Sequence, residues 1–190
     1  METTTLNLLR RRFAWRAISS RPVEPDTLAA LLEAAQLSAS CMNNQPWRFL
    51  VMNEPEALEK GRAALADGNY WARTAPVLLA GFSQADLDCR NPDGRQYFLF
   101  DLGMAVQNIL LQATELDLIA RPMAGFRPEA LREAFQIPPA YTILVMIAVG
   151  YKGDLDTLQE KQRNVSLAPR ARNPLDRNFF FNRFPAPEPG

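Results

Sequence analysis

The sequence has no histidine among its 190 residues. Imidazole is the usual general base of serine and cysteine hydrolases and a common ligand of zinc and haem iron. Its absence excludes Ser-His-Asp and Cys-His catalysis, HExxH sites and His-ligated zinc or haem. We therefore expect no metal site, and an enzyme with this sequence needs chemistry that does not depend on imidazole.

The sequence also has only two cysteines, no net charge and no long uninterrupted apolar run. Cys41 and Cys89 are too few for a disulfide framework, which favours a reducing compartment and a cytoplasmic location. The 21 basic and 21 acidic residues balance, so net charge gives no general attraction to nucleic acid or acidic membranes. The most apolar stretch, residues 98–118, is interrupted by Asp101 and Glu115 and is not a membrane span. We expect no nucleic-acid partner and no membrane partner.

The length predicts a single domain over residues 1–190, and periodicity predicts its elements. Residues 98–117 carry the strongest helical pattern and are expected to form a central helix buried on most sides. Asp26 is expected to cap the helix that follows Pro25. The expected helices cover 3–12, 26–35, 55–66, 98–117 and 128–135, and the expected strands cover 47–52, 76–82 and 143–149.

The last 40 residues differ in composition from the rest. They are rich in proline and contain Phe179, Phe180 and Phe181, which they cannot bury by themselves. We expect an extended arm from about residue 152 that packs back on the core or wraps a partner subunit.

Arginines cluster near both ends of the chain. Arg12 and Arg16 are four residues apart and converge on one side of a helical turn, and alternation puts Arg170 and Arg172 on one face of an extended chain. Forked guanidinium groups from two segments suit a phosphate. The alternative is a solvated basic surface.

Two further segments combine polar groups with aromatic residues or glycine. Residues 38–47 (SASCMNNQPW) form a loop able to recognise the edge of a flat heteroaromatic ring, or an ordinary polar connection anchored by Trp47. Gly125, within residues 122–126, allows close approach of a ligand or simply makes a turn. Cys41 lacks a histidine that would activate it as a nucleophile.

In this order, the segments resemble the FMN-dependent nitroreductase family over almost the whole chain. The family's N-terminal basic motif is matched by residues 12–18 (RFAWRAI) and its Ala-Pro-Ser-x-x-Asn-x-Gln-Pro-Trp loop by residues 38–47. Its Asp-x-Gly-x-Ala-x-x-Asn helix is matched by residues 101–113, and its basic-x-Arg-x-Pro-Leu ending by residues 170–175. The Gly-Phe loop corresponds to residues 125–126 and the Gly-Tyr strand end to residues 150–151.

The resemblance implies an α+β fold, with a mostly antiparallel central sheet flanked by helices and a C-terminal arm that wraps the partner of a homodimer. It implies FMN at the subunit interface, with NADPH or NADH as electron donor and a small-molecule acceptor such as a nitroaromatic or a quinone. No side chain would be catalytic, because flavin N5 carries hydride in a ping-pong cycle. The implied cofactor-binding residues are Arg12, Phe13, Ala14, Arg16, Ala39, Ser40, Cys41, Asn43, Asn69, Ala124, Gly125, Arg170 and Arg172.

The resemblance also gives these residues separate roles. The four arginines would hold the phosphate and ribityl end, and residues 39–43 would come from the other subunit to line the isoalloxazine ring. Asn69 would contact the pyrimidine edge, and the amides of Ala124 and Gly125 would lie near N5.

Three positions depart from the family pattern. Ala14 replaces a serine, Phe13 a basic residue and Ala39 a proline. Ala14 removes a hydroxyl donor to the phosphate, so these departures favour a divergent branch. The changes at Ala14 and Phe13 support one alternative, a non-catalytic or specialised flavin-binding dimer. A separate alternative, a nucleic-acid or membrane-surface binder that uses the basic N-terminus, is disfavoured by the zero net charge and the lack of a nucleic-acid-binding motif.

Overall fold

The computed structural model describes residues 5–184 and contains one four-stranded antiparallel sheet. Its strands are β1 (Arg48–Met52), β2 (Val77–Ser83), β3 (Leu118–Met123) and β4 (Thr142–Tyr151), in the order β1-β2-β4-β3. Every pairing is antiparallel, with Leu79 of β2 opposite Ile147 of β4. The α+β class with a mostly antiparallel sheet is confirmed.

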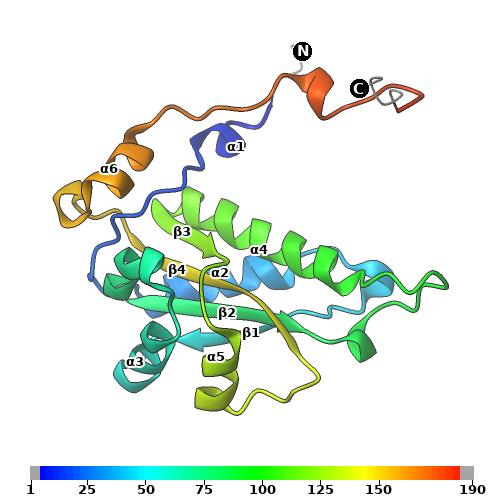
Figure 1. The fold of residues 1–190 in the computed structure, drawn as a ribbon, viewed down its shortest axis with the longest axis horizontal. Helices are drawn as coiled ribbons and strands as arrows, with labels where there is room; N and C mark the ends of the chain where they lie inside the picture. The colour runs from blue at the N-terminus through cyan, green and yellow to red at the C-terminus, as the bar shows by residue number, and fades with distance from the viewer. Residues whose placement is uncertain (1–4, 185–190) are drawn as a thin grey trace, which may run out of the picture.

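Helices cover both faces of this sheet (Figure 1). Alternation along β2 aims Val77 and Leu79 at α2 (Pro25–Gln36) and α4 (Phe98–Glu115). Leu78 and Ala80 point to the other face, toward α3 (Pro55–Ala63) and α5 (Pro128–Phe135). The two central strands are therefore buried on both faces over most of their length, as the continuous apolar run 143–149 predicts, except that Leu144 near the start of β4 is 40% exposed.

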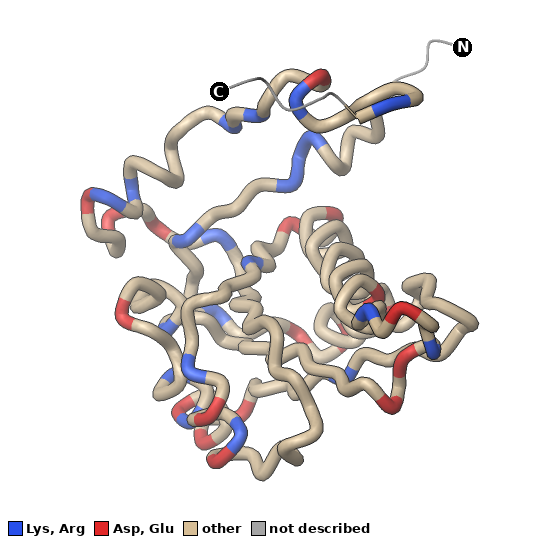
Figure 2. Tube along the Cα trace, turned by 45° about the vertical axis from the view of Figure 1, so that its right-hand side comes forward, with Lys and Arg blue, Asp and Glu red and all other residues tan. Residues whose placement is uncertain are grey.

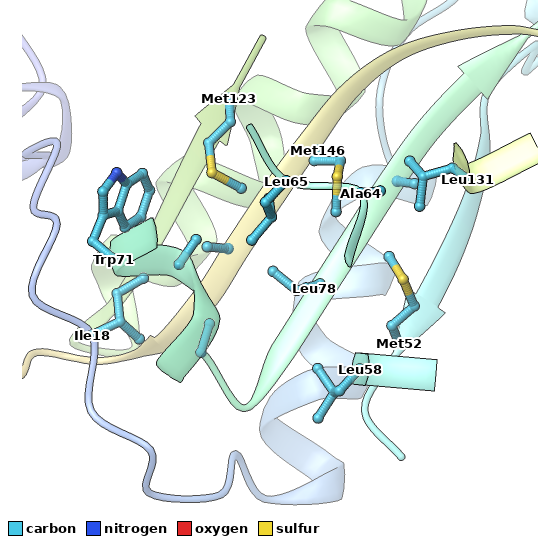
Figure 3. Close-up of a cluster of buried hydrophobic side chains, with 14 of the residues drawn as sticks. Ile18, Met52, Leu58, Ala64, Leu65, Trp71, Leu78, Met123, Leu131 and Met146 are labelled. Carbon is cyan, nitrogen blue, oxygen red and sulfur yellow. The ribbon is translucent and has the colours of Figure 1, made fainter. Parts of the chain in front are cut away.

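The core on the α3 and α5 side is shown in Figure 3. Leu78 and Met146 come from the central strands and are completely buried, as is Leu131 of α5. Trp71 and Ile18 close the end of this cluster toward the N-terminal segment. Burial of Ile18 here fixes the chain just after the basic N-terminal motif.

Strand β3 is absent from the sequence-based expectation, which treats its last residues as a turn. The segment contains Pro122, which lacks an amide proton, and the charged Arg121. Both are tolerated because β3 lies at the edge of the sheet and pairs only with β4.

Several predicted helix limits also need correction. Helix α2 begins at Pro25, with Glu24 at the N-cap position in place of the expected Asp26, because proline suits the first helical turn. Helix α3 ends at Ala63, three residues early, and α4 ends at Glu115. Within one protomer α4 is buried on one side only, since Phe100 is 55% exposed.

The two ends of the described chain run side by side, away from the sheet (Figure 1). The N-terminal segment contains α1 (Asn7–Arg11), and the C-terminal segment contains α6 (Glu160–Leu167). An exposed, irregular stretch follows, 168–184, in which Leu175–Arg177 form a short 3-10 helix. Residues 1–4, where the expected first helix begins, and the proline-rich tail 185–190 lie outside the described residues. Over residues 5–184 no helix is long and apolar enough to cross a membrane.

Candidate functional site

The two arginine clusters of the sequence meet in one pocket. Its cavity of about 280 Å³ is lined by the N-terminal segment, the edge strand β3 and the C-terminal segment. Figure 2 shows basic residues on both terminal segments where they run together. The lining residues are Arg12, Phe13, Ala14, Arg16, Arg121, Val165, Ala168, Pro169, Arg170, Ala171 and Arg172. We call this site the basic pocket.

The N-terminal side of the basic pocket is tied to the end of β4. Ser19 N donates to Tyr151 O at 2.9 Å, and Gly153 N donates to Ala17 O at 2.7 Å. A side chain at Gly150 would not fit beneath this segment, because its Cβ would lie 2.6 Å from Ile18 Cγ2. Glycine at 150 thus lets the segment that carries Arg12 and Arg16 lie directly on the sheet.

The C-terminal side is tied to the end of helix α1. The Arg170 guanidinium donates to the carbonyls of Leu9 at 3.1 Å and Arg10 at 3.2 Å, and also to that of Arg12. These carbonyls lie at or next to the helix C-terminus, where cations are favourable. This contact joins residues about 160 positions apart and places Arg172 beside the pocket.

The arginines of the basic pocket have no carboxylate partner among the described residues. Among residues 5–184, none of its five arginines forms an ion pair with a carboxylate. Burial lowers the pKa of Arg12, and repulsion from Arg170 and Arg172 lowers it further. Burial, with Arg16 and Arg12 nearby, lowers the pKa of Arg121 to about 10. Arg121 therefore stays charged at neutral pH, and a cluster of guanidinium groups that pairs with no carboxylate of the described residues suits a ligand with at least one negative charge.

An apolar pocket lies farther along the same strand. Residues 122–124 follow Arg121 directly and line a cavity of about 390 Å³ together with side chains from α4 and β4. The other lining residues are Leu102, Gly103, Val106, Leu144 and Val145. Since a strand advances about 3.3 Å per residue, β3 leads from a cationic site to an apolar one over a short distance.

Asn69 and Gly125 are in contact beside this strand end. Asn69 Nδ2 donates to Gly125 O at 2.8 Å, and Ala66 N donates to the same oxygen at 3.1 Å. A Cβ on residue 125 would lie 2.8 Å from Asn69 Nδ2, so glycine is required for the contact. Ala124 and Gly125 remain exposed. The structure thus brings together three of the predicted site residues, far apart in sequence.

The loop that contains Ala39, Ser40, Cys41 and Asn43 lies elsewhere. Met42 and Asn43 have φ of 51° and 56°, a left-handed conformation that non-glycine residues rarely adopt. The loop is held by Gln45 N, which donates to Ser40 Oγ at 3.0 Å, and by Cys41 N, which donates to Asp101 Oδ2 at 3.1 Å. The bond to Asp101 fixes the loop at the N-terminal end of α4.

Helix α4 separates this loop from the basic pocket. Arg11, beside the pocket, donates to Glu115 at the C-terminal end of α4 at 3.2 Å. Asp101 and Glu115 are 14 residues apart, which corresponds to about 20 Å along a helix. Within one protomer the loop and the pocket therefore form two separate sites.

The two cysteine thiols lie next to each other under the loop. A hydrogen bond with Cys41 and, secondarily, burial raise the pKa of Cys89 to about 11. Cys89 is therefore protonated at neutral pH and is no nucleophile.

The buried Asp101 makes the stability of the loop region depend on pH. It is fully buried, and its Oδ1 has no hydrogen-bond partner among the described residues. Burial raises the pKa of Asp101, the bond from Cys41 opposes this shift, and Asp88 adds to it. The folded state thus binds this proton more tightly than the unfolded state, and its contribution to stability falls as pH rises from the unfolded pKa through the folded one.

We expect Asp101→Asn to remove this pH dependence. The amide keeps an acceptor for Cys41 N but carries no charge, so the variant should gain about 1 kcal/mol over wild type at pH 7 and less at pH 4. Urea unfolding at several pH values measures the difference. Asp101→Leu, which leaves Cys41 N unpaired, should be destabilised at every pH. A constant difference between wild type and Asp101→Asn across this range would refute the assignment.

Sequence reasoning missed one arginine of the basic pocket, Arg121, along with the uncharged lining residues Val165, Ala168, Pro169 and Ala171. The signal of Arg121 in the sequence is a single charge inside the otherwise apolar and proline-containing stretch LIARPM. Without the strand assignment, that charge has no predictable neighbour.

Known proteins match this chain over most of its length. Residues 9–69 and 64–151 match the sequence model of the Nitroreductase family. A protein of Archaeoglobus fulgidus named as an NADH dehydrogenase/NAD(P)H nitroreductase is 29% identical over 157 residues, which cover 78% of this chain and 86% of that protein. The major NAD(P)H-flavin oxidoreductase of Aliivibrio fischeri is 25% identical over 173 residues, with 70% of this chain and 79% of that protein covered. A crystal structure described as an oxidoreductase containing FMN superposes with a TM-score of 0.88 at 27% identity, and covers 98% of this chain and 96% of its own.

Proposed function

Because this chain belongs to the nitroreductase family, we propose that it binds FMN between two identical subunits and passes hydride from NADH or NADPH to a small-molecule acceptor. It is an NAD(P)H-dependent oxidoreductase of the nitroreductase type. The acceptor that we propose is a nitroaromatic or a quinone, reduced in a ping-pong cycle. The proposal treats residues 1–190 as one domain with its arm, in the cytoplasm, where the free thiols of Cys41 and Cys89 would stay reduced.

The observation that carries the proposal is the basic pocket. Five guanidinium groups from three distant segments line one small cavity. None of them forms an ion pair with a carboxylate of the described residues. Burial lowers the pKa of Arg12, and repulsion from Arg170 and Arg172 lowers it further, so the like charges of the cluster repel one another. A phosphate dianion would reverse that repulsion, and guanidinium forks match its oxygen atoms.

The remaining residues also fit FMN. The molecule has a charged phosphate at one end and a flat, largely apolar ring at the other, and β3 leads from the basic pocket to the apolar one. Glycine at 125, with its carbonyl fixed by Asn69, leaves the backbone open to close approach of the ring. We place the phosphate and ribityl end at Arg12, Arg16, Arg170 and Arg172, with Phe13 and Ala14 beside them.

When bound, FMN supplies hydride acceptance and donation at its N5 atom, so no side-chain acid or base is needed. The chain's own residues orient the ring and stabilise charge. Asn69 would donate to the pyrimidine edge, and the amides of Ala124 and Gly125 would lie near N5. Fixed donors of this kind favour the reduced, more negative ring.

The proposed second subunit gives a role to the loop at the N-terminal end of α4 and to the exposed C-terminal arm. Following the family resemblance, the loop with Ala39, Ser40, Cys41 and Asn43, held at the N-terminal end of α4, would line the ring of the flavin whose phosphate the other subunit binds. The arm exposes Phe179, Phe180 and Phe181 at 60%, 43% and 87%. Exposed aromatic residues in such number favour an interface, which here would be the surface of the partner subunit.

Flavin spectroscopy tests this function. We expect the purified protein to be yellow, to be bleached by NADH or NADPH under anaerobic conditions, and to regain its colour with a nitroaromatic or a quinone. Parallel double-reciprocal plots would support the ping-pong cycle. A yellow protein that neither nicotinamide bleaches would favour a non-catalytic flavin-binding dimer. A colourless protein that binds no added FMN but shifts DNA or liposomes would refute the proposal.

A further inference from the structure

The five arginines of the basic pocket differ in how they are held. Arg12, Arg16, Arg170 and Arg172 lie in irregular segments, whereas Arg121 lies in strand β3, paired along its length with β4. A donor on a strand is held more rigidly than a donor on a loop, which matters for a binding site. Arg121 is therefore the cation whose position the sheet itself fixes.

The contacts of Arg121 leave most of its donors open to the pocket. Nη1 donates to Ala14 O at 2.7 Å, and the guanidinium stands over the Trp71 ring at 5.3 Å from its centroid. Arginine has five N–H donors, and this bond uses one. None of its nitrogen atoms is among the buried atoms without a partner. The remaining donor atoms are thus not fully buried, and the side chain lines the pocket, while the bond to Ala14 holds the segment between Arg12 and Arg16.

We propose that Arg121 is a specificity-determining residue that binds a phosphomonoester dianion in the basic pocket and so makes the protein select FMN over riboflavin. The inference rests on the proposed function. The low pKa of Arg121, caused by burial and by Arg16 and Arg12, fits a cation that lacks its counter-charge. Arg170 is different, because its guanidinium is taken up by carbonyls at the end of α1.

Binding of FMN and riboflavin to the full-length chain, freed of flavin by dialysis, tests the proposal. We expect Arg121→Met to raise the Kd of FMN at least tenfold, because a charge-assisted contact is lost, and to leave the Kd of riboflavin within about twofold. Arg121→Lys keeps the charge without the planar fork and should fall between wild type and the methionine variant. Quenching of flavin fluorescence measures both constants.

Arg132→Met is the matched control. Arg132 is also half-buried and donates to a carbonyl at 2.7 Å, that of Pro138, but it pairs with Glu129 and lies outside the basic pocket. The Arg132→Met substitution should lower thermal stability without changing the ratio of the FMN and riboflavin Kd values. If Arg121→Met weakens both flavins equally, or neither, the proposed role is wrong and Arg121 is a structural residue. If the methionine variant does not fold, the ratio of the FMN and riboflavin Kd values of Arg121→Lys tests the proposal, and a ratio equal to that of wild type would refute it.

NADPH also carries a phosphomonoester, so it needs its own measurement. We expect Arg121→Met to leave the ratio of the KM values for NADPH and NADH unchanged. A selective rise for NADPH would assign the pocket to the nicotinamide and overturn the inference. If the wild-type chain itself binds FMN no better than riboflavin, the proposed phosphate site fails, which is a different outcome from failure of Arg121 alone.

Discussion

Replacement of Arg12 and Arg172 together by alanine is expected to give a folded protein that purifies without flavin. The two side chains come from opposite ends of the chain and line the same small cavity. Each would donate charge-assisted hydrogen bonds to the phosphate, at about 1.5–3 kcal/mol per bond. Loss of two such bonds raises the Kd of FMN by about 10²- to 10⁴-fold.

The fold should tolerate this change, because removal of either arginine relieves repulsion within the pocket. The flavin content per protomer and the Kd from fluorescence quenching measure the effect, and circular dichroism monitors the fold. The matched control replaces Arg10 and Arg177, which lie in the same two segments but outside the cavity lining. Equal FMN affinity in the Arg12/Arg172 variant and in wild type would show that the phosphate site is misplaced.

Replacement of Phe179, Phe180 and Phe181 by serine is expected to convert the proposed dimer into monomers. Burial of a phenylalanine contributes about 1.5–3 kcal/mol, so three in each arm contribute about 5–9 kcal/mol before the cost of ordering the arm. The association constant should fall by at least about 10³-fold. FMN retention should fall with it, because the loop with Asn43 would no longer reach the ring.

Sedimentation velocity over a range of concentrations measures the association, and flavin absorbance measures retention. Replacement of the same three residues by leucine keeps the apolar surface and should leave the dimer intact. The arm would have no part in the interface if the serine variant sedimented as wild type does at every concentration.

The sequence was sufficient to predict the parts of the fold that carry strong periodicity. Helix α4 and the central strands β2 and β4 are long or continuously apolar, and their predicted positions differ from the observed ones by a few residues. Strand β3 could not be predicted, because Arg121 and Pro122 interrupt the apolar pattern and only its place at the sheet edge makes them tolerable. Its absence from the prediction also hid the fifth pocket arginine.

The candidate site was predictable as residue types but not as contacts. The spacing predicted that Arg12 and Arg16 converge on a helical turn, which is wrong, because α1 ends at Arg11 and both residues reach the pocket from an irregular segment. The predicted pairing of Arg170 with Arg172 along an irregular chain also brings both to the pocket. The meeting of the two pairs depends on Arg170, whose bonds to the end of α1 close a separation of about 160 residues that no local pattern records. The contact between Asn69 and Gly125, a hydrogen bond across 56 positions, is likewise recorded by no local pattern.

The expectation that α4 is buried on most sides fails for the single protomer for a related reason. Phe100 and Gly103 are apolar or small, as a buried helix requires, yet they are exposed in one chain. Apolar periodicity reports that a face avoids water, and it does not distinguish the core of one chain from a surface covered by another.

The length of α4 has a genetic consequence. In the proposed dimer, the basic pocket at one end of α4 would hold one flavin, and the loop at the other end would line the flavin of the partner subunit. Two inactive alleles, one defective in the pocket and one in the loop, would then complement each other, since their mixed dimer retains one whole site. An allele with both defects would instead be dominant, because it spoils both sites of every dimer that it forms with a normal copy.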